Sequence, residues 1–150
     1  MIELLLVVLI VSILASSLAV SLQGRKDVQA LRVGSEDLAA AVRLAASRAA
    51  SDGWIVQVAL LNDGRAFQVQ VVDEQGVSQP LAGMAGARRQ FAREVRVARL
   101  ERRSGKAQPA EVIAFGGGDD FAGSIELTDG LGNSRRIEVA DATAQVRIIE

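Results

Sequence analysis

Residues 1–22 read MIELLLVVLIVSILASSLAVSL, and this stretch decides how the rest of the chain is interpreted. After Glu3, no formally charged residue occurs until Arg25. A helix rises 1.5 Å per residue, so the uncharged run over residues 4–24 would be roughly 30 Å long, close to the hydrocarbon thickness of a bilayer. Its serines can hydrogen-bond to the carbonyl one turn earlier, which makes them tolerable in lipid. We therefore expect an apolar, membrane-inserted helix over residues 1–22.

Glu3, at the start of this helix, has an ordinary explanation and a narrower one. An acid at the headgroup level stays in contact with water and gains about 0.3–1 kcal/mol from the helix dipole. Here, however, an unbroken apolar run follows the acid at once. Residues 2–15, IELLLVVLIVSILA, resemble the N-terminal segment of the type IV pilins and type II secretion pseudopilins, whose mature chains begin Phe-Thr-Leu-Ile-Glu.

This resemblance implies a role for each part of the segment. Glu3 takes the position of the glutamate that neutralises the N-terminal ammonium of a neighbouring subunit, and a charge in an apolar bundle is costly unless it is paired. The implied partners are other pseudopilins, major and minor, the inner-membrane secretion platform, and the lipid bilayer before assembly. The helix contacts would be made by Leu4, Leu5, Leu6, Val7, Val8, Leu9, Ile10 and Val11.

The segment departs from the family pattern in its flanks. Met1 stands where a Leu is expected, two residues short of the mature N-terminus, and Val20 stands where many pilins have a proline. The cations Arg25, Lys26 and Arg32 follow the span, so the positive-inside rule alone would keep the rest of the chain in the cytoplasm. The family has the opposite orientation, which its basic leader helps to set. We therefore expect a leader upstream of Met1, and a single-pass protein of the bacterial inner membrane with its C-terminal domain in the periplasm. Neither processing nor N-methylation is visible in the sequence.

Residues 23–53 continue the helix as an amphipathic segment. Asp52-Gly53 is expected to end the helix, since Gly suits the left-handed position after the last turn. Gly24 and Gly34 are points where the helix could bend. We predict one helix of some fifty residues whose second half packs, through residues 28–49, on the domain that follows. The apolar positions with helical spacing are Val28, Leu31, Leu38, Val42, Ala45 and Ala49.

Residues 54–150 change to the period of two that is typical of strands. Asn62-Asp63-Gly64 has hairpin-turn chemistry, residues 74–90 are rich in loop residues, and residues 130–133 form a second turn. The fold class predicted is α+β and pilin-like: a long N-terminal helix, apolar in its first half, packed on a C-terminal antiparallel β domain of six or so strands in one sheet or two. Strands are expected near residues 54–61, 66–73, 94–101, 111–115, 124–129, 134–140 and 144–149.

The C-terminal stretch resembles one branch of the family, the GspH/FimT-type minor pseudopilins. The resemblance lies in IAFGGGD (113–119), GSIEL (123–127), RIEV (136–139) and TAQV (143–146), with Ala144 in place of the expected Gly. It implies a structural minor pseudopilin of a type II protein secretion system, assembled into or at the tip of a periplasmic pseudopilus. The alternative is a FimT-like minor type IV pilin that binds DNA. An unrelated single-pass protein with a periplasmic β domain is the third interpretation.

A dense run of arginines between residues 88 and 103 forms a local basic patch in a nearly neutral chain. Arginine suits planar, bidentate contacts with carboxylates and phosphates. The patch is either a solvated strand face or a surface for an acidic protein partner or, in the alternative function, for nucleic acid. The residues concerned are Arg93, Arg96, Arg99, Arg102 and Arg103.

Composition limits the chemistry. The chain has no His and no Cys, which removes the commonest general base, the thiolate metal ligand and any disulfide. Residues 116–120, GGGDD, could cradle a phosphate or, with Asp129, bind Ca²⁺. No helix follows them and the EF-hand spacing is absent, so a turn is the better interpretation. We expect no catalytic residue, no cofactor and no metal site.

Overall fold

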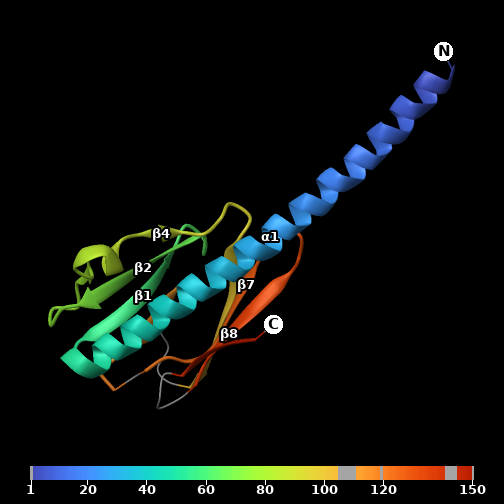
Figure 1. Cartoon of the computed structure of the whole chain (residues 1–150). Coiled ribbons are helices and arrows are strands. Elements are labelled where there is room, and N and C mark those ends of the chain that lie inside the picture. Colours follow the sequence, from blue (N-terminus) through green and yellow to red (C-terminus); the bar gives the residue numbers. More distant parts are fainter. Residues whose placement is uncertain (1, 105–110, 119, 141–144, 150) are drawn as a thin grey trace.

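The long helix dominates the molecule. The structure, a computed structural model, describes residues 2–104, 111–118, 120–140 and 145–149; the side chains of residues 2, 4, 5, 15–25 and 104 also lie outside the description. Helix α1 (Ile2–Asp52) has 51 residues, which makes it about 75 Å long. Its first half projects away from the rest of the chain, and its second half lies along the β domain (Figure 1). The single helix predicted from the sequence is confirmed.

Two glycines explain how α1 is positioned. Gly53 adopts φ +70° and its N–H donates to the Ala49 carbonyl at 3.1 Å, which closes the last turn. Gly34 lies within the continuous helix, so it is not a break. A Cβ at Gly34 would lie 3.1 Å from the Phe91 ring, so this position allows the chain before β5 (Arg96–Ser104) to approach α1 closely.

The β domain consists of two antiparallel sheets, as the α+β prediction requires. The first sheet has the order β3-β2-β1-β6, with β4 also paired to β2, and the second has the order β5-β7-β8-β9. The strands of the first are β1 (Ile55–Leu61), β2 (Ala66–Val72), β3 (Ser78–Pro80), β4 (Arg89–Gln90) and β6 (Val112–Phe115); those of the second are β5, β7 (Ala122–Thr128), β8 (Ser134–Val139) and β9 (Val146–Ile149).

Residues 74–90 are not the plain loop that was predicted. They contain β3, the short 3₁₀ helix η1 (Gly83–Gly86) and β4. The residues of β3 and β4 are all exposed, so these strands carry no alternation of apolar and polar residues by which a sequence pattern could reveal them. Pro80 lies in β3 at the edge of its sheet, where a missing N–H removes no ladder bond to a further strand.

The core lies between the second half of α1 and both sheets. Helix α1 contacts β1 and β6 of the first sheet and β8 and β9 of the second. Val28 is 54% exposed, so the buried face of the helix begins at Leu31, not at Val28 as expected. The fully buried partners on the strands include Val56, Val58, Ile113, Phe115, Ile125, Leu127 and Ile137.

The turn of the first hairpin links the two sheets. Asn62, Asp63 and Gly64 all have positive φ, as the predicted turn chemistry allows. The Gly64 carbonyl accepts a hydrogen bond from the Val97 N–H of β5 at 2.8 Å. A Cβ at Gly64 would come within 2.6 Å of the Val97 carbonyl oxygen, so only glycine permits this approach.

Candidate functional site

Residues 6–11 of α1 expose apolar side chains on every side. Residues Leu6–Val11 are consecutive and each is 48–61% exposed. Successive residues of a helix point about 100° apart, so no face of this segment is covered by the rest of the chain. Burying one such side chain is worth roughly 1.5–3 kcal/mol. Six of them in a row therefore supply a driving force of order 10 kcal/mol for leaving water, which makes this segment the strongest interaction surface on the described part of the chain.

Glu3 lies at the free end of this apolar segment and is exposed. The predicted contacts of Leu4 and Leu5 fall on side chains outside the described set. Ser12 donates its hydroxyl to the Val8 carbonyl at 2.8 Å, the bond to the preceding turn that the sequence suggested. Among the described residues, no helical stretch meets both the length and the apolarity that a bilayer crossing requires.

The five arginines of the predicted patch differ in exposure. Arg93 precedes β5, whereas Arg96, Arg99, Arg102 and Arg103 lie on it. Register shifts interrupt the β5–β7 pairing between Val97 and Arg99 and again after Arg102, which disturbs the alternation of the side chains. Arg93, Arg96, Arg99 and Arg103 are exposed, and Arg102 is half-buried.

Two of these arginines contact other groups of the β domain. Arg99 forms an ion pair with Glu101 at 2.7 Å. The Arg102 guanidinium carbon lies 5.5 Å from the centre of the Phe121 ring, a cation–π contact. Arg93, Arg96 and Arg103 are exposed beside them.

The Gly116–Asp120 loop is a turn. Its three glycines have φ values of +95°, +68° and +82°, and the Asp120 carboxylate accepts the Gly116 N–H at 2.6 Å. Asp119 lies outside the described residues. Asp129 follows the far end of the seven-residue strand β7, roughly 20 Å away at 3.3 Å per residue. The carboxylates of Asp120 and Asp129 therefore cannot share a Ca²⁺. Within the described part of the chain, no cluster of potential metal ligands occurs.

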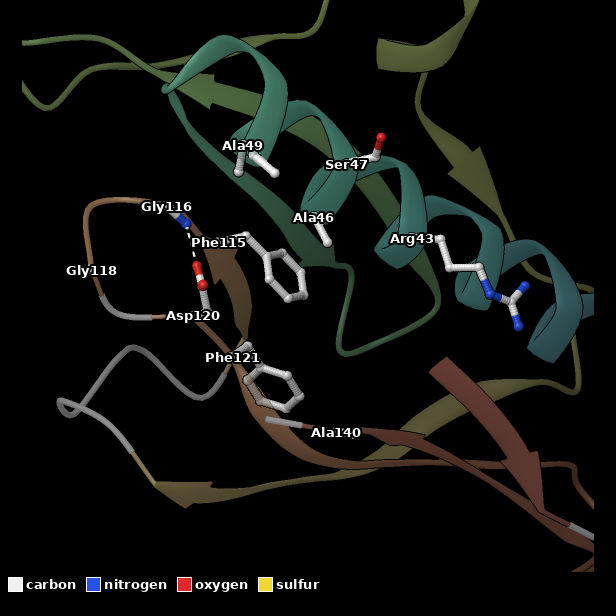
Figure 2. Close-up of a pocket in the computed structure, with 11 residues that line it drawn as sticks. Arg43, Ala46, Ser47, Ala49, Phe115, Gly116, Gly118, Asp120, Phe121 and Ala140 are labelled. Atoms are coloured by element: carbon white, nitrogen blue, oxygen red, sulfur yellow. Dashed lines mark hydrogen bonds between the residues drawn. The ribbon is translucent and has the colours of Figure 1, made fainter. Parts of the chain in front are cut away.

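A pocket of about 390 Å³ lies between this loop and the second half of α1. Figure 2 shows Phe115 and Phe121 on one side and the helix residues Arg43, Ala46 and Ala49 on the other. Its charged side chains are engaged in the fold: Asp120 holds the loop, and Arg43 donates to the Val146 carbonyl of β9 at 3.0 Å. The pocket therefore presents no group arranged for catalysis.

Asp129 organises the second hairpin. It is 5% exposed, and its carboxylate accepts the backbone N–H groups of Leu131 and Asn133, each at 2.9 Å, and the Asn133 side-chain amide at 2.7 Å. Burial alone would raise the pKa of Asp129, but these hydrogen bonds outweigh it and the pKa lies below its ordinary value. The carboxylate is a structural group of the turn.

Replacing Asp129 by Ala is expected to destabilise the β domain by about 1–3 kcal/mol at pH 7, because three donors lose a charged acceptor. A carboxyl whose pKa is lowered on folding stabilises the fold above its unfolded pKa of about 3.9, and this contribution disappears as the pH falls through the folded pKa. The difference between Asp129→Ala and the unaltered chain should therefore shrink below about pH 4. Urea unfolding measured between pH 3 and pH 7 checks this; a difference that does not change with pH would contradict it.

The sequence interpretation missed Trp54. This residue is the single tryptophan of the chain, stands between the end of α1 and β1, and is 56% exposed. The sequence does contain one sign of its importance: Trp54 is a large aromatic residue directly after Asp52-Gly53, where the helix is predicted to end. Trp54 lines a second cavity, of about 680 Å³, together with residues of β2 and β3.

Comparison with known proteins supports the fold. No family model matches the chain, and no curated protein matches it. A solved structure that is similar is the minor pseudopilin EpsH from the Type 2 Secretion System of Vibrio cholerae. The similarity has a TM-score of 0.60 and 10% sequence identity, and covers 79% of this chain and 95% of that chain. The chain therefore has the α+β fold of a minor pseudopilin, and the fold expected from its N-terminal and C-terminal resemblances is confirmed.

Proposed function

We propose that the chain is a structural minor pseudopilin of a type II protein secretion system. The observation that carries this proposal is the uncovered apolar segment of α1, residues 6–11, in a helix whose second half is packed into a folded β domain. Such a helix needs an apolar environment that the chain itself does not provide. The similarity of the fold to that of EpsH supports the proposal.

In this function the protein works by assembly. Residues 1–22 anchor the chain in the inner membrane with the β domain in the periplasm, next to the secretion platform. The same apolar surface then leaves lipid and packs against the helices of other major and minor pseudopilins, in or at the tip of the pseudopilus. Glu3 pairs with the N-terminal amine of a neighbour, since an unpaired carboxylate in such a bundle is costly. We expect no catalytic activity.

The nucleic-acid alternative receives less support. It depended on Arg93, Arg96, Arg99, Arg102 and Arg103 acting together. Arg102 lies over Phe121 and Arg99 is paired with Glu101. We therefore do not carry it further.

Replacing Glu3 by Leu tests the assembly role. We expect incorporation into the filament to fall at least tenfold, because the neighbour's ammonium loses its counter-charge, while the β domain stays folded. The measurement is the amount of the chain recovered in isolated pseudopili relative to the membrane fraction. Glu111→Leu, which removes an exposed carboxylate of the β domain, is the matched control and should incorporate normally. Normal incorporation of Glu3→Leu would reject the role given to Glu3.

A further inference from the structure

Three loops of the β domain meet at the end from which the first half of α1 projects. The Arg65 carbonyl of the β1–β2 turn accepts the Phe91 N–H at 3.0 Å. The β7–β8 turn lies against the segment that follows Phe91, since a Cβ at Gly130 would be 3.9 Å from the Glu94 Cβ. Figure 1 shows this turn, in orange, beside α1 where the helix leaves the domain. We call these loops the helix-exit end of the domain; they comprise residues 62–65, 88–96 and 129–133.

The apolar segment of α1 sets how far this end lies from a bilayer. The uncharged run ends at Gly24. Lys26 is exposed on α1 and lines one hollow together with Phe91 and Ala92. Two residues of helix advance only about 3 Å, whereas the headgroup layer extends about 5–8 Å beyond the hydrocarbon core. A helix inserted as far as Gly24 therefore places the helix-exit end at the level of the lipid headgroups.

The helix-exit end is basic. Arg89 lies 4.0 Å from Asp37 of α1, whereas Arg65 and Arg93 are exposed and line one shallow hollow. Arginine forms bidentate hydrogen bonds with phosphate, so these two side chains suit the headgroup of an anionic lipid. The arginines of this end are Arg65, Arg88, Arg89, Arg93 and Arg96, and the acids are Asp63, Glu94 and the buried Asp129.

The β7–β8 turn adds an apolar side chain to this basic surface. Leu131 is 65% exposed, and its N–H donates to the Asp129 carboxylate at 2.9 Å, which holds the turn in place. Binding to a membrane surface grows with the apolar area that enters the headgroup layer and with the attraction between cations and anionic lipids. An exposed leucine close to exposed arginines provides both terms.

We propose that the helix-exit end binds the anionic surface of the bilayer in which the helix is inserted. Arg65 and Arg93 contact headgroup phosphates, and Leu131 enters between the headgroups. The bilayer is the occupant because α1 holds this end within reach of it and because the charges are opposite. A single helix leaves the domain free to tilt and rotate, so the contact fixes its orientation before assembly. The inference rests on the proposed function, since it requires the apolar segment to be in a membrane.

A fluorescent label at position 131 of the full chain tests the contact, because the chain has no native cysteine. The Leu131→Cys variant is labelled and reconstituted in vesicles of phosphatidylglycerol or of phosphatidylcholine, each with the same fraction of lipid that carries a nitroxide on its headgroup. We expect strong quenching of the label in phosphatidylglycerol and weak quenching in phosphatidylcholine. Val77→Cys is the matched control: Val77 is 52% exposed and lies beyond the opposite end of β2, so its label should escape quenching. Equal quenching at the two positions, or equal quenching in the two lipids, overturns the contact.

Arg65→Gln and Arg93→Gln test whether these cations carry the contact. The ratio of docked to free domain is obtained from the quenching at position 131 as the fraction of phosphatidylglycerol rises. It should fall about fivefold in each single variant and roughly 25-fold in the double variant, the effect of removing one or two cations from an anionic surface. Arg103→Gln removes an exposed arginine from the other end of β5 and should leave the ratio unchanged. A double variant that docks as well as this control overturns the contact.

A label at Val7→Cys separates this inference from the proposed function, because it reports insertion of α1. Quenching at position 7 by lipids with brominated acyl chains, without docking at position 131, overturns the contact and leaves the insertion required by the proposed function intact. Docking at position 131 without quenching at position 7 supports the lipid contact and rejects insertion of the helix. The absence of both overturns both.

Discussion

Replacing Gly123 by Ala is expected to destabilise the β domain by about 3 kcal/mol, the upper part of the range for overpacking. Gly123 lies on β7 between Arg102 of β5 and Val139 of β8. A Cβ there would overlap the Glu101 carbonyl oxygen. The obstacle is backbone, so no side-chain rotation relieves it, and β5 must move away from β7. Urea unfolding of the full chain in detergent micelles, followed by circular dichroism, measures the loss.

Ser124→Ala is the matched control for Gly123→Ala. Ser124 is the next residue of the same strand and is half-buried, and its replacement should change the free energy of unfolding by no more than about 0.5 kcal/mol. If Gly123→Ala is equally mild, then β5 does not approach β7 as closely as described.

Replacing Phe115 by Ala is expected to lower the free energy of unfolding by about 3–5 kcal/mol, the usual cost of removing a buried phenyl group. Phe115 is 1% exposed, pairs with Val56 across β6 and β1, and its ring points toward the second half of α1 (Figure 2). The variant would open the adjoining pocket into the core. It therefore weakens the contact that holds the helix on the first sheet.

Thermal unfolding measures the effect of Phe115→Ala, and Leu131→Ala is its control. Leu131 is also a large apolar residue but is 65% exposed, so its truncation should leave the midpoint unchanged. A Phe115→Ala midpoint within a degree or two of that control would mean that the helix is held mainly by the second sheet.

The helix and the longer strands could be predicted because each of them buries one face, so that apolar residues recur along it at a regular spacing. Residues 31–49 return to the core every three or four positions, and Asp52-Gly53 marks the end of the helix. The strands β1, β2, β7 and β8 each bury one face, which produces the alternation that a sequence displays. The antiparallel β domain follows from these elements, but its division into two sheets was left open by the sequence.

The surfaces of the domain could not be predicted in the same way. The exposure of the β5 arginines depends on irregular pairing with β7, which the arginine run itself does not encode. The Trp54 cavity joins the helix end to residues 71–82, a juxtaposition that exists only once β1 has paired with β2. The exposed apolar segment at residues 6–11 could be predicted because its residues are consecutive in the sequence.

The hydrogen bond from Arg43 to Val146 relates the fold to the order in which the chain is made. Arg43 is translated 103 residues before Val146. The alanine-rich face of the helix lacks this cover until β9 has been made, so the β domain cannot reach its final packing before then. A chain that is clipped or stopped before residue 146 would therefore keep this part of the helix accessible to proteases, and quality control could distinguish it from the folded protein.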